Sequence, residues 1–487
     1  EQVEAMALRF VNPEQNVVDE PAYDKWHRKL KKDLQRFRNA RKVKVDLSDS
    51  EGPLDRSSSS PKYSLTIRDS NFGIQGSCAV FLIPQGREHE WMFSSEEGQA
   101  NLCREAGYRR VILVTLNRGH TFVSSQSVQD ELSPKVKEIA GRATKGDSIP
   151  YLSVGGDIGK RQTIFQGTSE LTGDFFVEDI SANEDTDSKL SDSSVLRRLV
   201  FASNSTVIQS AIAFGRDSNA AISFNFLYLA HDYQQAMAAG LVLCEDLIVN
   251  PETCSRRILQ VGLGGGCFAM FLNSLFPKCN LEVCELDGAI AEMAKQYFGL
   301  NENIPVQIKD GLRRIQELHD ECLADQHLEK FSLIIIDVNN LDLTLGMSFP
   351  PKDFVSEQCL KSIRNLLTSN GCLMINLVVR DSELYSSILS LLQELFGEVR
   401  VVFASKDEVN RIVFAFPTSC SLSTRDVAVE RLPADESERW RFLTHPQLLQ
   451  LRASDLGRFI DEMFPSPDIA PQPRKQKSKR RKKKAKK

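Results

Sequence analysis

Residues 258–287 (ILQVGLGGGCFAMFLNSLFPKCNLEVCELD) constrain the fold more than any other part of the chain. Ile258–Val261 is a short apolar run and Gly262–Gly266 is a glycine-rich turn. A helix-forming segment then leads to a second apolar run, Leu281–Cys284, which ends at Glu285. Buried parallel strands have continuous apolar sequences and need a crossover helix between them. The stretch therefore predicts an α/β fold built on a parallel sheet.

The glycine turn and the acid after the second run indicate an adenosine cofactor. Glycines let the backbone approach a ligand closely, and a carboxylate at a strand end accepts hydrogen bonds from ribose hydroxyls. The order is G-x-G-G-G, with Cys267 where the dinucleotide fingerprint has its third glycine. S-adenosylmethionine, whose methionine part would pack on the turn, fits this order better than a dinucleotide. A glycine turn that serves only tight packing is the alternative.

Two further acids follow apolar runs in the same way. Val306–Ile308 precedes Asp310, and Phe331–Ile336 precedes Asp337. Ligands of open α/β sheets lie beyond the C-terminal ends of the strands, so we expect Glu285, Asp310 and Asp337 to line one crevice. The remaining strands are expected at Cys372–Val378, Val399–Phe403 and Arg411–Phe416, with the last two paired.

Residues 62–417 resemble the Rossmann-like class I methyltransferases, and among them the spermidine synthase-like branch. Tyr233–Met237 (YQQAM) is similar to the Y-Q-E-M element of polyamine synthases. The closer resemblance is to the methyltransferase-like protein 13 family, the dual lysine and N-terminal methyltransferases of translation elongation factor 1-alpha. The strings that carry it are Phe81–Trp91, Tyr151–Gly159, Arg197–Asn204, Val261–Gly266, Asp337-Val338, Thr344–Ser348 and Asn376–Asp381.

This resemblance implies a Rossmann-like, seven-stranded class I methyltransferase domain preceded by a smaller mixed α/β accessory domain. It also implies S-adenosylmethionine as cofactor and the N-terminal α-amine of elongation factor 1-alpha as substrate. The lysine-directed half would lie upstream, and the start at Glu1 suggests a fragment. Polyamine synthases resemble G-G-G-D-G and D-x-S-D-P where this chain has Cys267 and Val338-Asn339-Asn340, which disfavours aminopropyl transfer. Their tendency to dimerise implies a homodimer by analogy.

Methyl transfer to an amine needs an uncharged nitrogen held in line with the methyl group. At about pH 7.4, neutralising an α-amine costs about 0.7 kcal/mol and neutralising a lysine about 4 kcal/mol. An N-terminal acceptor therefore needs no strong base, and a carboxylate that orients the amine suffices. We expect Asp337 to have this role, with Asn339 as a second acceptor. Capping of the next helix is the structural alternative for Asp337.

The other expected site residues surround this carboxylate. Tyr228 and Tyr233 are expected to cover the substrate, or else to be ordinary helix residues. The seven scattered histidines indicate no metal site. The expected cofactor-binding residues are Gly262, Leu263, Gly264, Gly265, Gly266, Glu285, Leu286, Asp310, Gly311 and Gln234.

Composition shifts divide the chain. Apolar residues spaced by three or four positions predict a helix over Asp24–Lys44, and Gly155–Gly159 is expected to be a turn rather than a second ligand loop. The expected segments are a helical segment and linker (1–61), an accessory domain (62–180), an acidic linker (181–194), a methyltransferase domain (195–420), a helical extension (421–465) and a disordered basic tail (466–487).

The charge of the chain is unevenly distributed. The chain has 61 basic residues, and 11 of them lie in residues 474–487, so the remaining 50 against 65 acidic residues give the body a net charge of −15. The tail is expected to bind RNA or ribosomes, to act as a nuclear signal, or to fold back on the acidic body. Eleven cysteines without a C-x-x-C pair suit reduced thiols, which predicts a cytoplasmic protein, or a nuclear one through the tail.

Three functions remain open at this point. The first is an S-adenosylmethionine-dependent protein α-amine methyltransferase. The second is a non-catalytic scaffold of the same fold, recruited to RNA or ribosomes by its tail. The third is a small-amine or polyamine transferase. No apolar run approaches the roughly 20 residues that span a bilayer, so no membrane partner is expected.

Overall fold

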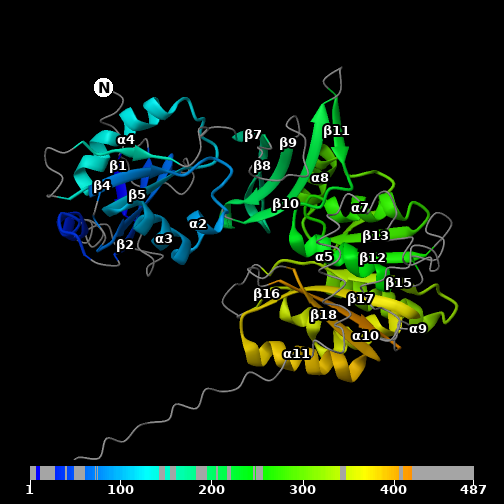
Figure 1. Cartoon of the computed structure of the whole chain (residues 1–487). Helices are drawn as coiled ribbons and strands as arrows, with labels where there is room; N and C mark the ends of the chain where they lie inside the picture. Colours follow the sequence, from blue (N-terminus) through cyan, green and yellow to red (C-terminus); the bar gives the residue numbers. More distant parts are fainter. Residues whose placement is uncertain are drawn as a thin grey trace, which may run out of the picture. The chain divides into compact units, whose positions relative to one another are not determined.

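The structure is a computed structural model with two compact units (Figure 1). The N-terminal unit comprises residues 1–225, 264–267 and 287–300, and the parallel-sheet unit comprises residues 226–263, 268–286 and 301–487. The structure describes residues 7–10, 28–38, 41–48, 61–71, 73, 75–141, 148–153, 161–181, 195–204, 207–216, 221–244, 247, 256–340, 347–404 and 410–418. The expected glycine turn at 155–159, the helical extension and the basic tail lie outside these residues.

The parallel-sheet unit contains the sheet that the apolar runs predict. Its strand order is β14-β13-β12-β15-β17-β19-β18, in which β19 is antiparallel to both neighbours and the other pairings are parallel. A short strand, β16 (Met347–Phe349), adds to β17. The bounds are β12 (Arg257–Val261), β13 (Asn280–Glu285), β14 (Val306–Ile308), β15 (Phe331–Ile336), β17 (Leu367–Val379), β18 (Glu398–Phe403) and β19 (Arg411–Phe416).

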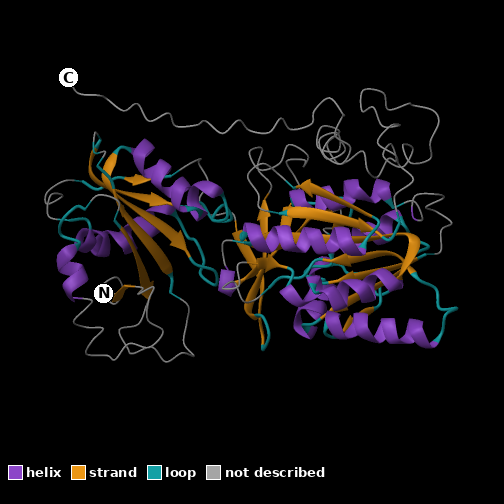
Figure 2. Ribbon diagram, turned by 90° about the horizontal axis from the view of Figure 1, so that it is seen from below, coloured by secondary structure: helices purple, strands orange, loops and turns teal. Residues whose placement is uncertain are grey.

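Amphipathic helices cover this sheet (Figure 2). Side chains of α9 (Gly311–Ala324), α10 (Glu357–Leu366) and α11 (Ser382–Leu395) form one buried cluster with side chains of β12, β15 and β17. On β15 all six residues are buried, as a central strand covered on both faces requires. Another helix, α5 (Asp232–Gly240), contacts β18 and β19. This packing holds the C-terminal ends of β13, β14 and β15 along one edge.

The N-terminal unit holds a first sheet of order β1-β2-β3-β5-β4-β6. Within it, β4 is parallel to β5 and β6, and the other pairings are antiparallel. Its elements are β1 (Ala7–Phe10), β2 (Lys42–Ser48), β3 (Tyr63–Asp69), β4 (Gly76–Leu82), α2 (Trp91–Ser94), α3 (Glu96–Ala106), β5 (Tyr108–Leu116), α4 (Ser125–Ile139) and β6 (Tyr151–Leu152).

A second sheet of this unit is antiparallel throughout, with order β11-β10-β9-β8-β7. Because β8 pairs with β9, this sheet joins strands from both sides of the expected linker at 181–194, so the expected boundary at 195 does not separate two domains. The elements are β7 (Arg161–Ser169), β8 (Gly173–Ser181), β9 (Val195–Phe201), η3 (Ala202–Asn204), β10 (Ile208–Arg216) and β11 (Ile222–Asn225).

The helix expected over Asp24–Lys44 is wrong at its C-terminal end. Residues 28–33 are helical, but Lys42–Ser48 forms β2. Its sequence, KVKVDLS, alternates apolar and polar residues, and Val45 and Leu47 are fully buried. This period of two is typical of a strand with one buried face. The expected boundary at 61 consequently falls between β2 and β3, which are neighbours in one sheet.

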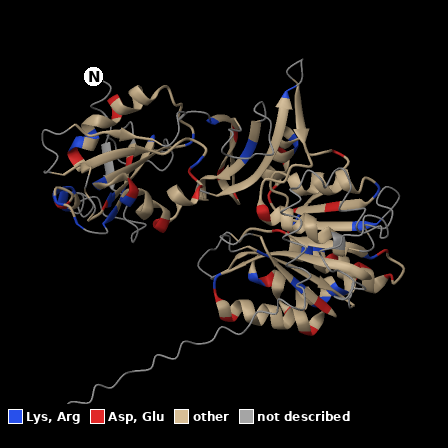
Figure 3. Cartoon of the chain, viewed as in Figure 1, with Lys and Arg blue, Asp and Glu red and all other residues tan. Residues whose placement is uncertain are grey.

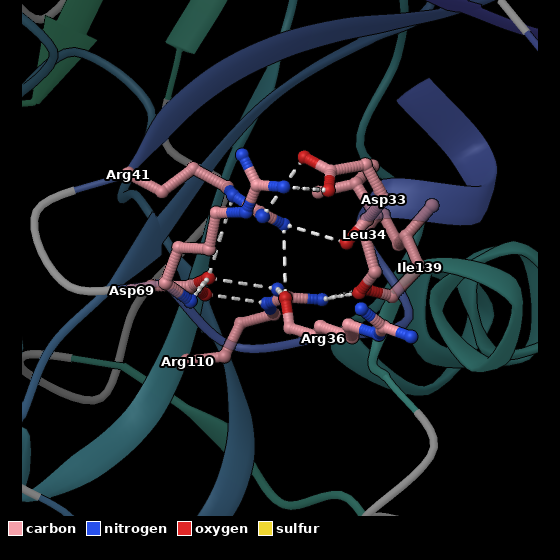
Figure 4. Close-up of polar contacts among 8 residues, drawn as sticks. Asp33, Leu34, Arg36, Arg41, Asp69, Arg110 and Ile139 are labelled. Atoms are coloured by element: carbon pink, nitrogen blue, oxygen red, sulfur yellow. Dashed lines mark hydrogen bonds and ion pairs between the residues drawn. The ribbon is translucent and has the colours of Figure 1, made fainter. Parts of the chain in front are cut away.

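A buried arginine joins the elements around the first sheet (Figure 4). The Arg110 guanidinium is fully buried and donates to both carboxylate oxygens of Asp69, at 2.6 and 2.9 Å. It also donates to the backbone carbonyls of Leu34, Ile139 and Arg36, at 2.6, 2.5 and 3.3 Å. The segment after residues 28–33, the end of α4 and the strands β3 and β5 are thereby held by one side chain.

Charged residues are interspersed along both units (Figure 3). On the outer face of α10, Lys361 donates to Glu357 at 2.6 Å, with both side chains more than half exposed. Such surface pairs contribute little to stability, roughly 0–1 kcal/mol each. Within the described residues, no helix is long and apolar enough to cross a membrane.

Candidate active site

The glycine turn follows β12 and requires glycine for steric reasons. Gly262 has φ +94°, and a Cβ on it would lie 2.1 Å from the carbonyl oxygen of Asp337. Gly264 and Gly266 also have positive φ, +54° and +75°. L-residues with side chains rarely adopt these angles. The turn therefore requires glycine for its backbone angles and for close packing against Asp337, and the approach of a ligand to it stays a prediction.

Glu285 ends β13 and is tied to the turn. One carboxylate oxygen, Oε2, accepts a hydrogen bond from the backbone N–H of Leu263 at 2.9 Å. The Gly262 N–H donates to the carbonyl of Cys284 at 2.9 Å, which continues the strand pairing into the turn. The acid and the glycine turn thus form one rigid unit at the end of the two strands, where the sequence places the ribose-binding acid.

Two apolar side chains stand exposed beside this acid. Leu286 is 52% exposed and Ile308 is 54% exposed, and Ile308 is paired in register with Glu285 on the neighbouring strand. Apolar side chains left in water at a strand end are suited to cover the faces of a flat ring such as adenine. Leu286 was expected to bind the cofactor, which stays a prediction, and Ile308 was not named from the sequence.

Asp310 and Gly311 have structural roles in addition to any ligand contact. The Asp310 carboxylate caps α9, accepting from the N–H groups of Leu312 and Arg313 at 2.7 and 3.3 Å. A Cβ on Gly311 would lie 2.3 Å from Cγ1 of Val261, so close packing requires glycine there. Asp310 is exposed, and both capping hydrogen bonds use Oδ1, while its expected contact with an adenine amino group stays a prediction.

Two buried glutamines carry acceptor oxygens without partners among the described residues. Gln234 on α5 is 5% exposed, and its Oε1 accepts no hydrogen bond. Gln260 on β12 is 2% exposed and donates to the Gly262 carbonyl at 2.9 Å, but its Oε1 is also unpaired. An unpaired buried polar atom costs roughly 1–3 kcal/mol, so such atoms are commonly matched by a ligand. Gln234 was expected to bind the cofactor and Gln260 was not.

Asp337 directly follows β15 and is held by two donors. Asn376 on β17 donates to Oδ1 at 3.0 Å, and the hydroxyl of Tyr233 donates to Oδ2 at 3.2 Å. Burial raises the pKa of Asp337, and the hydrogen bonds from Asn376 and Tyr233 partly offset this rise. The carboxylate is fixed in orientation and caps no helix in the described residues, contrary to the structural alternative.

The support of Asp337 extends one residue further. Asn376 is fully buried, and its Oδ1 accepts a hydrogen bond from Nδ2 of Asn410 at 3.0 Å. Asn410 directly precedes β19, the strand paired with β17. Neither asparagine was identified from the sequence as a site residue. Asn376 begins the NLVVRD string of the family resemblance, and that string was the available signal.

The remaining expected site residues are Asn339, two positions after this carboxylate, and two tyrosines in or just before α5. Asn339 is half-buried and makes no hydrogen bond within the described residues. Tyr228 is 9% exposed and precedes α5. Tyr233 lies in the first turn of α5 and stacks on His231 at 5.6 Å between ring centroids. The Tyr233 hydroxyl is the donor to Asp337 described above.

The residues present fit S-adenosylmethionine. The side-chain-free turn, the strand-end acid, the exposed apolar pair and the unpaired Gln234 oxygen are what a sulfonium nucleoside with an ammonium group requires. Within the described residues, no three His, Cys, Asp or Glu side chains come together as a metal site would need. The arrangement offers a ligand cradle beside a fixed carboxylate acceptor.

Comparisons with known proteins point to one group. The chain is 32% identical over 417 residues to the eEF1A lysine and N-terminal methyltransferase of Xenopus laevis, covering 79% of this chain and 57% of that protein. It is 34% identical over 413 residues to the Homo sapiens protein of the same name, covering 76% of this chain and 55% of that protein. The chain thus spans about half the length of these relatives. No protein-family model matches.

A solved structure, human methyltransferase-like protein 13 in complex with SAH, matches with 29% identity and a TM-score of 0.35, covering 48% of this chain and 93% of that one. The sequence relatives confirm the resemblance found from the strings of residues 62–417. The sheet order confirms the expected seven-stranded, Rossmann-like fold. In sequence, this chain is similar over about three quarters of its length to the eEF1A lysine and N-terminal methyltransferases, and its parallel sheet has a Rossmann-like order.

Proposed function

We propose that this chain is an S-adenosylmethionine-dependent protein methyltransferase acting on an N-terminal α-amine. The observation that carries the proposal is the fixed carboxylate of Asp337, which follows the strand next to the glycine turn. A scaffold that only binds the cofactor has no use for a buried carboxylate held by two donors. The names of the relatives make translation elongation factor 1-alpha the proposed substrate.

Asp337 and Tyr233 have different roles in the proposed methyl transfer. Bound S-adenosylmethionine supplies a methyl group on a positively charged sulfur. The Asp337 Oδ2 accepts an N–H of the substrate amine, which aims the nitrogen lone pair. As the new bond forms, positive charge develops on the nitrogen, and the nearby carboxylate stabilises it. The Tyr233 hydroxyl, which donates to the same oxygen, covers the amine and excludes water.

An α-amine is favoured over lysine because the described site lacks a strong base. Removing the proton from lysine at neutral pH costs about 3 kcal/mol more than from an α-amine. Next to Asp337 the chain has Asn339, an uncharged residue, so no second carboxylate follows there to accept that proton. Methylation of the N-terminal nitrogen, and not of a lysine, is the most specific claim of this proposal.

The test is to incubate the protein with labelled S-adenosylmethionine and elongation factor 1-alpha, then to map the label by mass spectrometry. The matched substrate is the same factor with an acetylated N-terminus. We expect label on the N-terminal residue of the free form, none on the acetylated form, and none with the Asp337→Asn enzyme. Label on a lysine in both forms would overturn the α-amine assignment.

Two other outcomes decide between the remaining functions. If a polyamine is labelled or extended in place of the protein, the chain is a small-amine transferase. If adenosylhomocysteine does not bind in calorimetry, the scaffold function stands. The Asp337→Asn enzyme is expected to bind adenosylhomocysteine as the unchanged protein does, which separates loss of chemistry from loss of cofactor.

A further inference from the structure

The second part of the glycine turn and the helix after Glu285-Leu286 belong to the N-terminal unit. Residues 264–267 and 287–300 are grouped with residues 1–225 and not with the parallel sheet from which they emerge. Both segments directly continue cofactor elements, the first from Gly262-Leu263 and the second from Glu285-Leu286. Contacts from the β7–β11 sheet account for this grouping.

The first contact holds the turn. The Ser210 hydroxyl on β10 accepts the backbone N–H of Gly265 at 2.9 Å, and Ser210 is 5% exposed. The turn fits closely around this side chain, since a Cβ on Gly264 would lie 2.7 Å from the Ser210 Oγ. A glycine-rich turn has high conformational freedom when unbound, and an external hydrogen bond reduces it.

The second contact holds the start of α8 (Gly288–Phe298). Asp287 caps this helix through Oδ1, which accepts from Ala289 N–H at 3.0 Å. Its other oxygen, Oδ2, accepts hydroxyl hydrogen bonds from Ser169 at 2.5 Å and from Thr172 at 2.6 Å, at the connection between β7 and β8. Asp287 is 6% exposed, so these bonds are shielded from water.

The third contact holds the end of the same helix. Arg197 on β9 donates to the backbone carbonyl of Tyr297 at 2.8 Å and is itself fixed by Asp179 at 2.7 and 2.8 Å. The rings of Phe165 on β7 and Tyr297 stack with centroids 4.7 Å apart. The β7–β11 sheet therefore contacts both ends of α8, and it forms a hydrogen bond with Gly265 in the glycine turn.

We propose that the β7–β11 sheet positions the cofactor loops, with Ser210 and Thr172 as positioning residues that pre-organise the glycine turn and the segment after Glu285. This inference depends on the cofactor site proposed above. Pre-organised loops lose less conformational entropy when a ligand binds, so removing either hydroxyl weakens cofactor binding without touching the ligand.

The test uses three single variants. Ser210→Ala removes the acceptor for Gly265, and Thr172→Val removes one donor to Asp287. Thr168→Val is the matched control, because Thr168 lies at the end of β7 and its hydroxyl donates to the exposed Asp174 at 2.6 Å. We expect the Kd of adenosylhomocysteine to rise roughly threefold to tenfold in the first two variants and to stay unchanged in the control.

A second readout separates positioning from general stability. Hydrogen exchange of the cofactor-free protein is expected to speed up over residues 262–267 in Ser210→Ala and over residues 286–290 in Thr172→Val. The KM for S-adenosylmethionine should rise while kcat at saturating cofactor is retained. Equal losses of melting temperature in all three variants, with unchanged exchange and unchanged Kd, would overturn the inference. If the unchanged protein binds no adenosylhomocysteine, the proposed function fails, and the exchange data still decide whether the sheet orders the loops.

Discussion

Replacing Asn376 by leucine tests how the carboxylate of Asp337 is kept ready for the substrate. Leucine keeps the branching at Cγ, although it is larger, and it removes both the donor to Asp337 Oδ1, which lies 3.0 Å from Asn376 Nδ2, and the acceptor of Asn410. A hydrogen bond to a charged group contributes roughly 1.5–3 kcal/mol. At about 1.36 kcal/mol per tenfold, kcat/KM near neutral pH is expected to fall roughly 10-fold to 150-fold.

The pH dependence identifies the cause of this loss. Burial raises the pKa of Asp337, and the Asn376 bond is one of two interactions that lower it. Without that bond the carboxyl remains protonated to higher pH, so the acid limb of the kcat/KM profile shifts upward. The loss of kcat/KM in Asn376→Leu should therefore be largest in mildly acidic buffer and smaller in alkaline buffer.

The control for this variant is Ile375→Val, in the neighbouring position of β17. Ile375 is 1% exposed, and losing one methyl group costs roughly 0.5–1.5 kcal/mol of stability without a polar change. Its acid limb should match that of the unchanged protein. The reasoning is refuted if Asn376→Leu loses the same factor of activity at every pH, because the defect would then be structural.

Three further changes have expected outcomes of their own. Gly262→Ala places a Cβ 2.1 Å from the Asp337 carbonyl at φ +94°, so calorimetry should detect no adenosylhomocysteine binding. Leu286→Ser removes an apolar side chain that is already 52% exposed, so the ligand-free melting temperature should stay constant. The Kd of adenosylhomocysteine should rise about fivefold, because about 1 kcal/mol of apolar contact with the ligand is lost. Arg110→Met removes the bidentate partner of buried Asp69 and leaves it the Arg38 N–H at 2.9 Å and the Arg41 guanidinium at 3.7 Å, and denaturant unfolding should show a loss of roughly 3–5 kcal/mol with unchanged cofactor affinity. A loss below about 1 kcal/mol would show that Asp69 finds other partners.

Much of the parallel sheet could be predicted because its strands are local apolar runs. Val306–Ile308, Phe331–Ile336 and Arg411–Phe416 are strands with the expected bounds. β17 starts at Leu367, five positions before the expected Cys372, because the polar residues Thr368–Asn370 interrupt the apolar run. The β2 strand was missed because its alternating pattern adjoins a charged segment with helical spacing.

The site was predictable where a residue follows its own strand, and not where distant segments meet. Glycines with positive φ and acids at strand ends have a signature in the sequence, since local backbone geometry demands them. The bond from Asn376 to Asp337 arises because β17 pairs with β15, and the bond from Asn410 to Asn376 arises because β19 inserts antiparallel beside β17. No local pattern encodes that insertion.

By itself, the sequence determined the parallel α/β fold, the glycine turn, the order of Glu285, Asp310 and Asp337, and the relationship to the elongation-factor methyltransferases. Only the tertiary structure decided that β7–β11 form one sheet across the expected domain boundary, and that Ser210 and Thr172 reach the loops after Gly264 and Leu286. The physical reason is the distance along the chain over which each effect acts. Backbone preference and apolar periodicity act over a few residues, whereas these hydrogen bonds join positions 55 and 115 residues apart, whose meeting depends on the packing of the whole unit.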